Sequence, residues 1–139
     1  MTPLCKEALY WLILLAVTVA AYAVLAMLIG PGGACGAFGL LGLGGLLPLV
    51  YRKHGQAVAL DERDQQIGIR ALVAGYSIFW LYFTLGIMGL WAALCYEGRA
   101  TVSVHLLPQI VCGGGILFFT ARAVAILVQY RLQAAEKGD

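Results

Sequence analysis

The chain has 139 residues, of which 62% are hydrophobic and only 12% are charged, and its mean hydropathy is +0.88. Soluble domains contain about 25% charged residues, so this composition excludes a water-soluble globular domain and indicates an integral membrane protein. The net charge of +2 is small and dispersed, and it predicts no basic surface for nucleic acid.

Two apolar runs begin the chain. Residues 8–29 contain no charge and are longer than the apolar part of a signal peptide, so we expect a retained membrane span. Residues 34–51 form a shorter, glycine-rich second run. The sequence GPGGACG between them predicts a tight turn, and therefore an antiparallel hairpin of two spans.

A polar link, residues 52–70, follows the hairpin and carries a charged tetrad. The tetrad suits the start of a helix, because Asp61 can cap the exposed N–H groups and acids are favoured at the positive end of the helix dipole. Alternatively, its carboxylates recruit basic residues of a partner, Arg122 of this chain, or a cytosolic ligand. No His or Cys lies nearby, so we predict no metal site. The charged residues of interest are Asp61, Glu62, Arg63, Asp64 and Arg70.

The sequence LDERDQQI around this tetrad resembles small bacterial and archaeal integral membrane proteins of unknown function. Those proteins carry a DERD-type motif in the same link, between the second and third of four spans. The resemblance covers about eight residues plus the topology. It implies a four-helix membrane fold and supplies no activity.

Two further apolar runs complete the predicted fold. Residues 71–95 are rich in aromatic side chains, and residues 106–130 contain a single charge, Arg122. A charge within a span is costly, so it needs a partner or must reach the interface. We consider two roles for Arg122: an ion pair or hydrogen bonds within the bundle, with the tetrad acids or with the hydroxyls of Tyr76, Ser77 and Thr84, or contact with lipid phosphates.

Small residues predict where helices approach one another closely. The fourth run has three successive glycines, which suit a close helix crossing, a hinge or a break that lines a cavity. The glycines that we expect to mediate helix packing are Gly36, Gly39, Gly42, Gly45, Gly113, Gly114 and Gly115. Two cysteines near the predicted outer face, Cys35 and Cys95, are candidates for a disulfide.

The basic residues predict the orientation. Seven of the nine Lys and Arg residues lie in segments that share one side if the N-terminus is inside, whereas the outer links contain only Arg99. By the positive-inside rule, both termini and the 52–70 link face the cytoplasm. The expected fold is thus all-α: one polytopic domain, residues 1–139, with four transmembrane helices in the inner (plasma) membrane.

No catalytic motif or cofactor-binding pattern occurs in the sequence, so we predict a non-enzymatic protein without a cofactor. Short loops and glycine-rich and aromatic faces favour an accessory or regulatory subunit that contacts a larger membrane assembly. The alternative is a small homo-oligomeric transporter or channel that uses Arg122 and the glycine-rich fourth span. The expected partners are the lipid bilayer and another membrane protein or a second copy of the chain.

Overall fold

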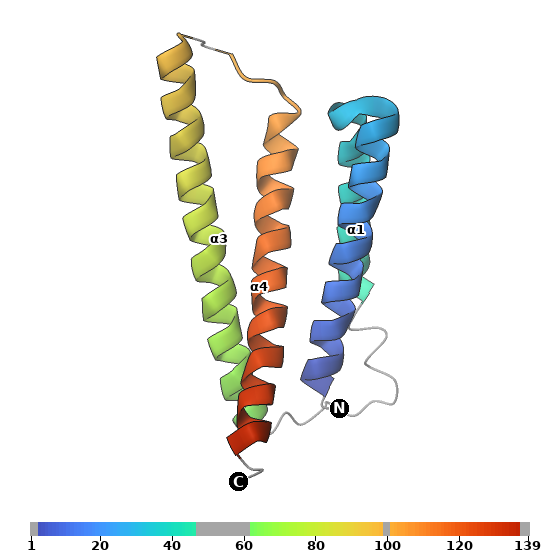
Figure 1. The fold of residues 1–139 in the computed structure, drawn as a ribbon, viewed down its shortest axis with the longest axis vertical. Helices are drawn as coiled ribbons and strands as arrows, with labels where there is room; N and C mark the ends of the chain where they lie inside the picture. The colour runs from blue at the N-terminus through green and yellow to red at the C-terminus, as the bar shows by residue number, and fades with distance from the viewer. Residues whose placement is uncertain (1–2, 47–61, 99–100, 137–139) are drawn as a thin grey trace.

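The computed structural model describes residues 3–46, 62–98 and 101–136, and every regular element in these ranges is a helix (Figure 1). In chain order the elements are α1 (Pro3–Ala34), the 3-10 helix η1 (Cys35–Leu46), α3 (Glu62–Glu97) and α4 (Leu106–Glu136). The expected all-α class is confirmed. Asp61 and most of the expected 52–70 link lie outside the described residues, but α3 already begins at Glu62.

A sharp turn near the end of α1 folds the chain back on itself (Figure 1). Gly30 has φ 83° and ψ 165°, a conformation that essentially only glycine adopts. Pro31 follows it, and proline suits the first turn of a helix because its missing N–H has no partner there in any case. The GPGG sequence therefore forms the tight antiparallel turn that was predicted.

The returning segment η1 lies alongside α1. The Tyr10 hydroxyl donates a hydrogen bond to the Leu43 carbonyl oxygen at 3.1 Å, and the rings of Tyr22 and Phe38 stack with centroids 5.1 Å apart. Gly44 makes this approach feasible, because a Cβ atom there would lie 2.1 Å from the indole ring of Trp11. The two arms are thus packed along most of their length.

The part of the chain that the structure describes contains three segments long and apolar enough to cross a membrane, not the four expected: Pro3–Gly44, Glu62–Glu97 and Leu106–Leu132. The difference lies in the expected second span, residues 34–51. Its described part is the 12-residue 3-10 helix η1, which continues the apolar segment of α1 without a polar break. Residues 47–51 lie outside the described residues.

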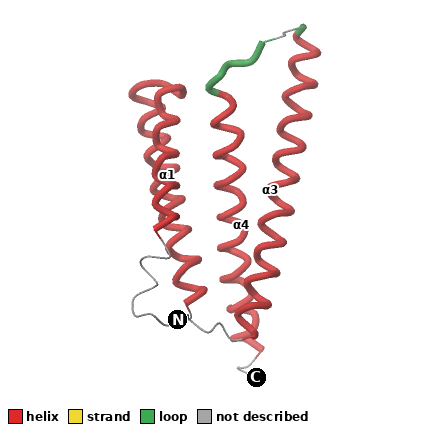
Figure 2. The backbone as a smooth tube through the Cα atoms, turned by 180° about the vertical axis from the view of Figure 1, so that it is seen from behind, coloured by secondary structure: helices red, strands yellow, loops and turns green. Residues whose placement is uncertain are grey.

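Helix α4 lies between α3 and the α1–η1 pair (Figures 1 and 2). The start of α1, the start of α3 and the end of α4 meet at one end of the molecule, and both termini are at this end (Figure 1). Toward the opposite end α3 diverges from α4, and beyond Gly75 no residue of α3 is buried. The core is therefore concentrated at the end that carries the termini.

Candidate functional site

The core where α1, α3 and α4 meet is built from apolar residues at helical spacing. On α3 the buried positions are Asp64, Ile67, Ala71 and Gly75, which recur at intervals of three or four and so form one stripe. Ile67 and Ala71 of this stripe belong to one buried cluster with apolar residues of the other two helices: Leu4, Ala8, Trp11, Leu14, Ala123 and Ile126. Four polar side chains at this core form two contacts between helices.

Arg122 of α4 pairs with Glu7 of α1. Its Nη2 atom lies 2.9 Å from Glu7 Oε1, and the two side chains are 23% and 33% exposed. The Nε atom of Arg122 is buried and has no hydrogen-bond partner among the described residues. The pair neutralises both charges in an apolar setting and connects the N-terminal part of α1 to α4.

A second polar contact connects α4 to α3. The Tyr130 hydroxyl donates a hydrogen bond to Asp64 Oδ1, and Asp64 is only 9% exposed. A buried carboxylate without a donor is costly, so this hydrogen bond is what permits an acid on the buried stripe. We call the four residues of the two contacts, Glu7, Asp64, Arg122 and Tyr130, the terminal junction.

The three described residues of the charged tetrad lie in different surroundings. Glu62 and Arg63 are exposed in the first turn of α3, whereas Asp64 is buried, and Arg70 is exposed two turns later. Glu62 and Asp64 lie at the helix start as predicted, where the positive end of the dipole stabilises them. The structure pairs Arg122 with Glu7, and not with Glu62 or Asp64, the two described acids of the tetrad.

The glycines of α4 lie in different surroundings. A Cβ atom at Gly113 would lie 2.9 Å from the Tyr82 hydroxyl oxygen, and one at Gly114 would lie 2.9 Å from the Phe79 ring, whereas Gly115 faces open space. On α3, a Cβ atom at Gly75 would lie 2.9 Å from the Phe118 carbonyl oxygen. Missing side chains on both helices thus allow the close crossing of α3 and α4.

The glycine ridge of η1 faces away from the other described residues. A 3-10 helix has three residues per turn, so glycines at intervals of three form a straight line along it. No described residue lies within 4 Å of a Cβ atom built at Gly36, Gly39 or Gly42. Gly45 also lies in η1, but its surroundings are outside the description. The packing contact of η1 with α1 uses Gly44 instead, a residue that sequence reasoning did not select.

The exposed part of α3 carries an aromatic and hydroxyl-bearing face. Tyr76 and Trp80 stack with ring centroids 6.3 Å apart, and the Ser77 hydroxyl donates to the Val73 carbonyl oxygen at 2.9 Å. A hollow of about 440 Å³ lies on this side of the helix. We call its lining the α3 outer face: Tyr76, Ser77, Trp80, Leu81, Thr84 and Leu85. The hydroxyls of Tyr76, Ser77 and Thr84, which we expected near Arg122, form no hydrogen bond with it in the structure.

Cys35 and Cys95 are not bonded to each other. The proposed disulfide is therefore not formed in this structure, where α3 diverges from the α1–η1 hairpin toward the end that carries Cys95 (Figure 1). Within the described ranges no three His, Cys, Asp or Glu side chains are close enough to share a metal ion.

Two residues of the terminal junction were missed by sequence reasoning. These residues are Glu7, directly before the first apolar run, and Tyr130, the last residue of the fourth. The sequence offers a signal for the first: Glu7 is the acid directly before the uncharged run 8–29, and Arg122 is the single charge within residues 106–130. No comparable signal in the sequence indicates Tyr130.

Comparison with known proteins adds no identification. No protein-family model, curated protein or solved structure matches this chain.

Proposed function

We propose that this chain is a non-enzymatic integral membrane protein that serves as an accessory or regulatory subunit of a larger membrane assembly. Its anchor consists of four passes through the inner membrane, with both termini and the charged link on the cytoplasmic side. The α3 outer face and the exposed charges at the start of α3 form the recognition surfaces.

The direction of the elements supports four passes. Helix α1 runs away from the terminal junction, η1 returns beside it, and α3 and α4 repeat this pattern (Figures 1 and 2). Twelve residues of 3-10 helix extend about 24 Å at roughly 2.0 Å per residue, which approaches the roughly 30 Å hydrocarbon thickness. Of the described basic residues, Lys6, Arg63 and Arg131 lie at the end at which α3 begins, which favours the cytoplasm for that end.

The observation that carries the subunit role is the α3 outer face. Trp80 is 56% exposed and Leu81 is 61% exposed, and among the described residues none of α3 beyond Gly75 is buried. Gly86 and Gly89 follow the α3 outer face along the helix, and no described residue lies within 4 Å of a Cβ atom built at either position. Aromatic side chains beside small residues suit the close packing of another membrane helix.

Transport is the second candidate, and the terminal junction makes it less favoured. An anion path through Arg122 would have to compete with the Glu7 carboxylate, which already holds the guanidinium at 2.9 Å. The two close glycines of α4, Gly113 and Gly114, are occupied by contacts with α3. A packed crossing is a poor lining for an ion path.

Site-specific photo-crosslinking tests the proposal. A photoreactive amino acid is introduced at Leu81, on the α3 outer face, and as a matched control at Leu28, which is 74% exposed on α1. The chain is expressed in its native host, irradiated in intact membranes and purified in mild detergent. We expect one discrete protein adduct from Leu81 and none from Leu28, with the Leu81 adduct reduced by Trp80→Ala.

Three results would contradict the subunit role. The first is labelling of lipid alone at both positions, and the second is equal protein adducts at both. The third is a Leu81 adduct with a second copy of this chain, together with ion flux in liposomes that Arg122→Met abolishes, which would establish the transporter alternative.

A further inference from the structure

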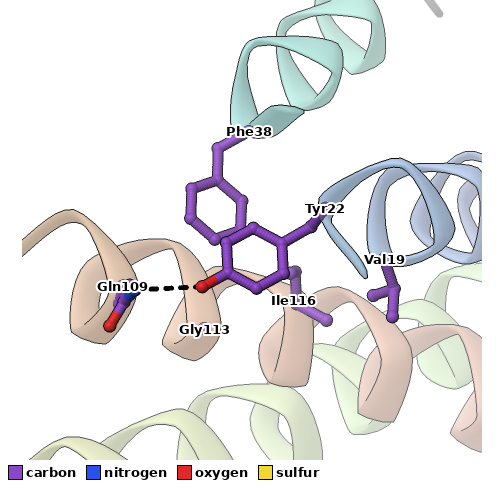
Figure 3. Close-up of a pocket in the computed structure, with 6 residues that line it drawn as sticks. All are labelled: Val19, Tyr22, Phe38, Gln109, Gly113 and Ile116. Atoms are coloured by element: carbon purple, nitrogen blue, oxygen red, sulfur yellow. Dashed lines mark hydrogen bonds between the residues drawn. The ribbon is translucent and has the colours of Figure 1, made fainter. Parts of the chain in front are cut away.

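A cavity of about 270 Å³ lies where α1, η1 and α4 meet, away from both the terminal junction and the α3 outer face. Among the described residues, six line it: Val19, Tyr22, Phe38, Gln109, Gly113 and Ile116 (Figure 3). This volume is slightly below the range of about 300–1,000 Å³ that is typical of ligand pockets, so the space suits one small molecule or a segment of one lipid chain. The described lining carries no charge, and it is apolar except for one hydrogen-bonded pair of neutral side chains.

The polar pair consists of Tyr22 and Gln109. The Gln109 amide nitrogen Nε2 donates a hydrogen bond to the Tyr22 hydroxyl oxygen at 2.9 Å (Figure 3). This bond leaves the hydrogen of the Tyr22 hydroxyl and the carbonyl oxygen Oε1 of Gln109 without a recorded partner in the described ranges. Both groups are side by side, one a donor and the other an acceptor.

A membrane setting makes it energetically costly to leave these two hydrogen-bonding groups without a partner. Tyr22 is eight residues before the turn at Gly30, or about 12 Å along the helix, which places it within the apolar segment. A polar group without a hydrogen-bond partner in hydrocarbon is unfavourable, and lipid tails cannot supply one. A hydroxyl group can do so, because it accepts from Tyr22 and donates to Gln109 at the same time.

We propose that this cavity binds a neutral, hydroxyl-bearing lipid, with its hydroxyl at the Tyr22–Gln109 pair and its apolar chain against Val19, Phe38 and Ile116. None of the described lining residues is charged, which favours a neutral head group over a phosphate or a carboxylate. The inference rests on the membrane location of the chain and does not depend on the subunit role.

A photoreactive probe tests the site. The purified full chain, reconstituted in nanodiscs, is irradiated with a diazirine-bearing fatty alcohol, with the methyl ether of the same chain, or with the corresponding fatty acid. We expect saturable labelling by the alcohol on peptides that contain Tyr22 or Gln109. The ether cannot donate to Gln109, and loss of one hydrogen bond should lower its labelling about fivefold.

Two variants locate the effect. Val19→Trp fills the cavity and should remove the saturable labelling, whereas Val24→Trp is its control, since the two valines are 50% and 56% exposed on the same helix and Val24 does not line the cavity. Gln109→Met removes the acceptor of the alcohol hydrogen and should abolish the preference for alcohol over ether, whereas Tyr22→Phe removes a donor that both probes use and should lower the labelling by both. Helix content and monodispersity are checked for each variant.

The proposal is overturned by labelling that spreads evenly over the helices, or by equal labelling with alcohol and ether in the unmodified chain. It is also overturned if Val19→Trp retains the labelling, or if the fatty acid binds as well as the alcohol. Failure of the crosslinking experiment at Leu81 would leave this result unaffected, so the two proposals are separately refutable.

Discussion

The Glu7–Arg122 ion pair is the contact whose energy the structure predicts most directly. Breaking a fully buried pair by removing one partner costs about 3–5 kcal/mol, whereas an exposed pair contributes about 0–1 kcal/mol. The two side chains are 23% and 33% exposed, so water screens part of the interaction. We therefore expect a coupling energy between them of about 1–2 kcal/mol.

A double-mutant cycle measures this coupling. The substitutions Glu7→Met and Arg122→Met remove each charge without a new hydrogen bond, and unfolding is followed by circular dichroism during titration of mixed micelles with denaturing detergent. Each single variant should lose stability, because the remaining charge stays in an apolar setting. The double variant should recover much of the loss, since two well-packed apolar side chains can replace an ion pair at little cost.

The exposed Arg70 provides the control. Arg70→Met lies on the solvent side of α3 and should change stability by no more than about 0.5 kcal/mol. Additive effects of the Glu7 and Arg122 substitutions, within about 0.3–0.5 kcal/mol, would refute the claim that the two residues stabilise the fold together.

Three further substitutions test the packing. Tyr130→Phe removes the donor to the buried Asp64 carboxylate and should cost about 1–3 kcal/mol in the same unfolding assay; an unchanged transition would mean that water or lipid replaces the hydroxyl. Gly44→Ala places a methyl group 2.1 Å from the neighbouring indole and should lower the free energy of unfolding by about 1–3 kcal/mol. The control is Gly42→Ala, at a position that faces open space on η1, and it should leave the stability unchanged. Equal effects of the two substitutions would contradict the packing of η1 on α1. Gly30→Ala forces a side chain into the φ 83° conformation and should cost about 1–3 kcal/mol; a crosslink between cysteines introduced in the two arms would report whether the hairpin persists, and a fully stable variant would refute the strained turn.

Hydropathy and turn chemistry predict the elements of this fold well. The runs at 71–95 and 106–130 correspond to α3 and α4, and the acid-rich start of α3 follows from the preference of helix starts for carboxylates. The glycine-rich run after Pro31 is harder to predict, because glycine favours no single conformation strongly. Its described part forms η1, a 3-10 helix, where the sequence predicts a membrane-length α-helix.

The contacts of the candidate site depend on features that periodicity does not encode. Which face of α1 meets α4 is decided by the fit of large and small side chains, such as the stack of Trp11 on Phe119 at 3.9 Å. That fit selects Glu7 as the partner of Arg122. Sequence reasoning identified the charge that needed a partner, but it could not identify the partner without the rotation of the helices.

The central claim is that this chain crosses the membrane with the start of α3 in the cytoplasm. Glu62 and Cys95 lie near opposite ends of α3, 33 residues or about 50 Å apart along the helix, a distance greater than the roughly 30 Å hydrocarbon core. Both positions are exposed. They can therefore report the two sides of the membrane from a single helix.

The most direct test labels these positions in intact cells with a membrane-impermeant maleimide. One variant retains only Cys95, and the other carries Glu62→Cys with every native cysteine replaced by alanine. We predict that Cys95 reacts in intact cells, whereas the cysteine at position 62 reacts only after the membrane is permeabilised. Reaction of both positions from the outside, or of position 62 alone, would contradict the account.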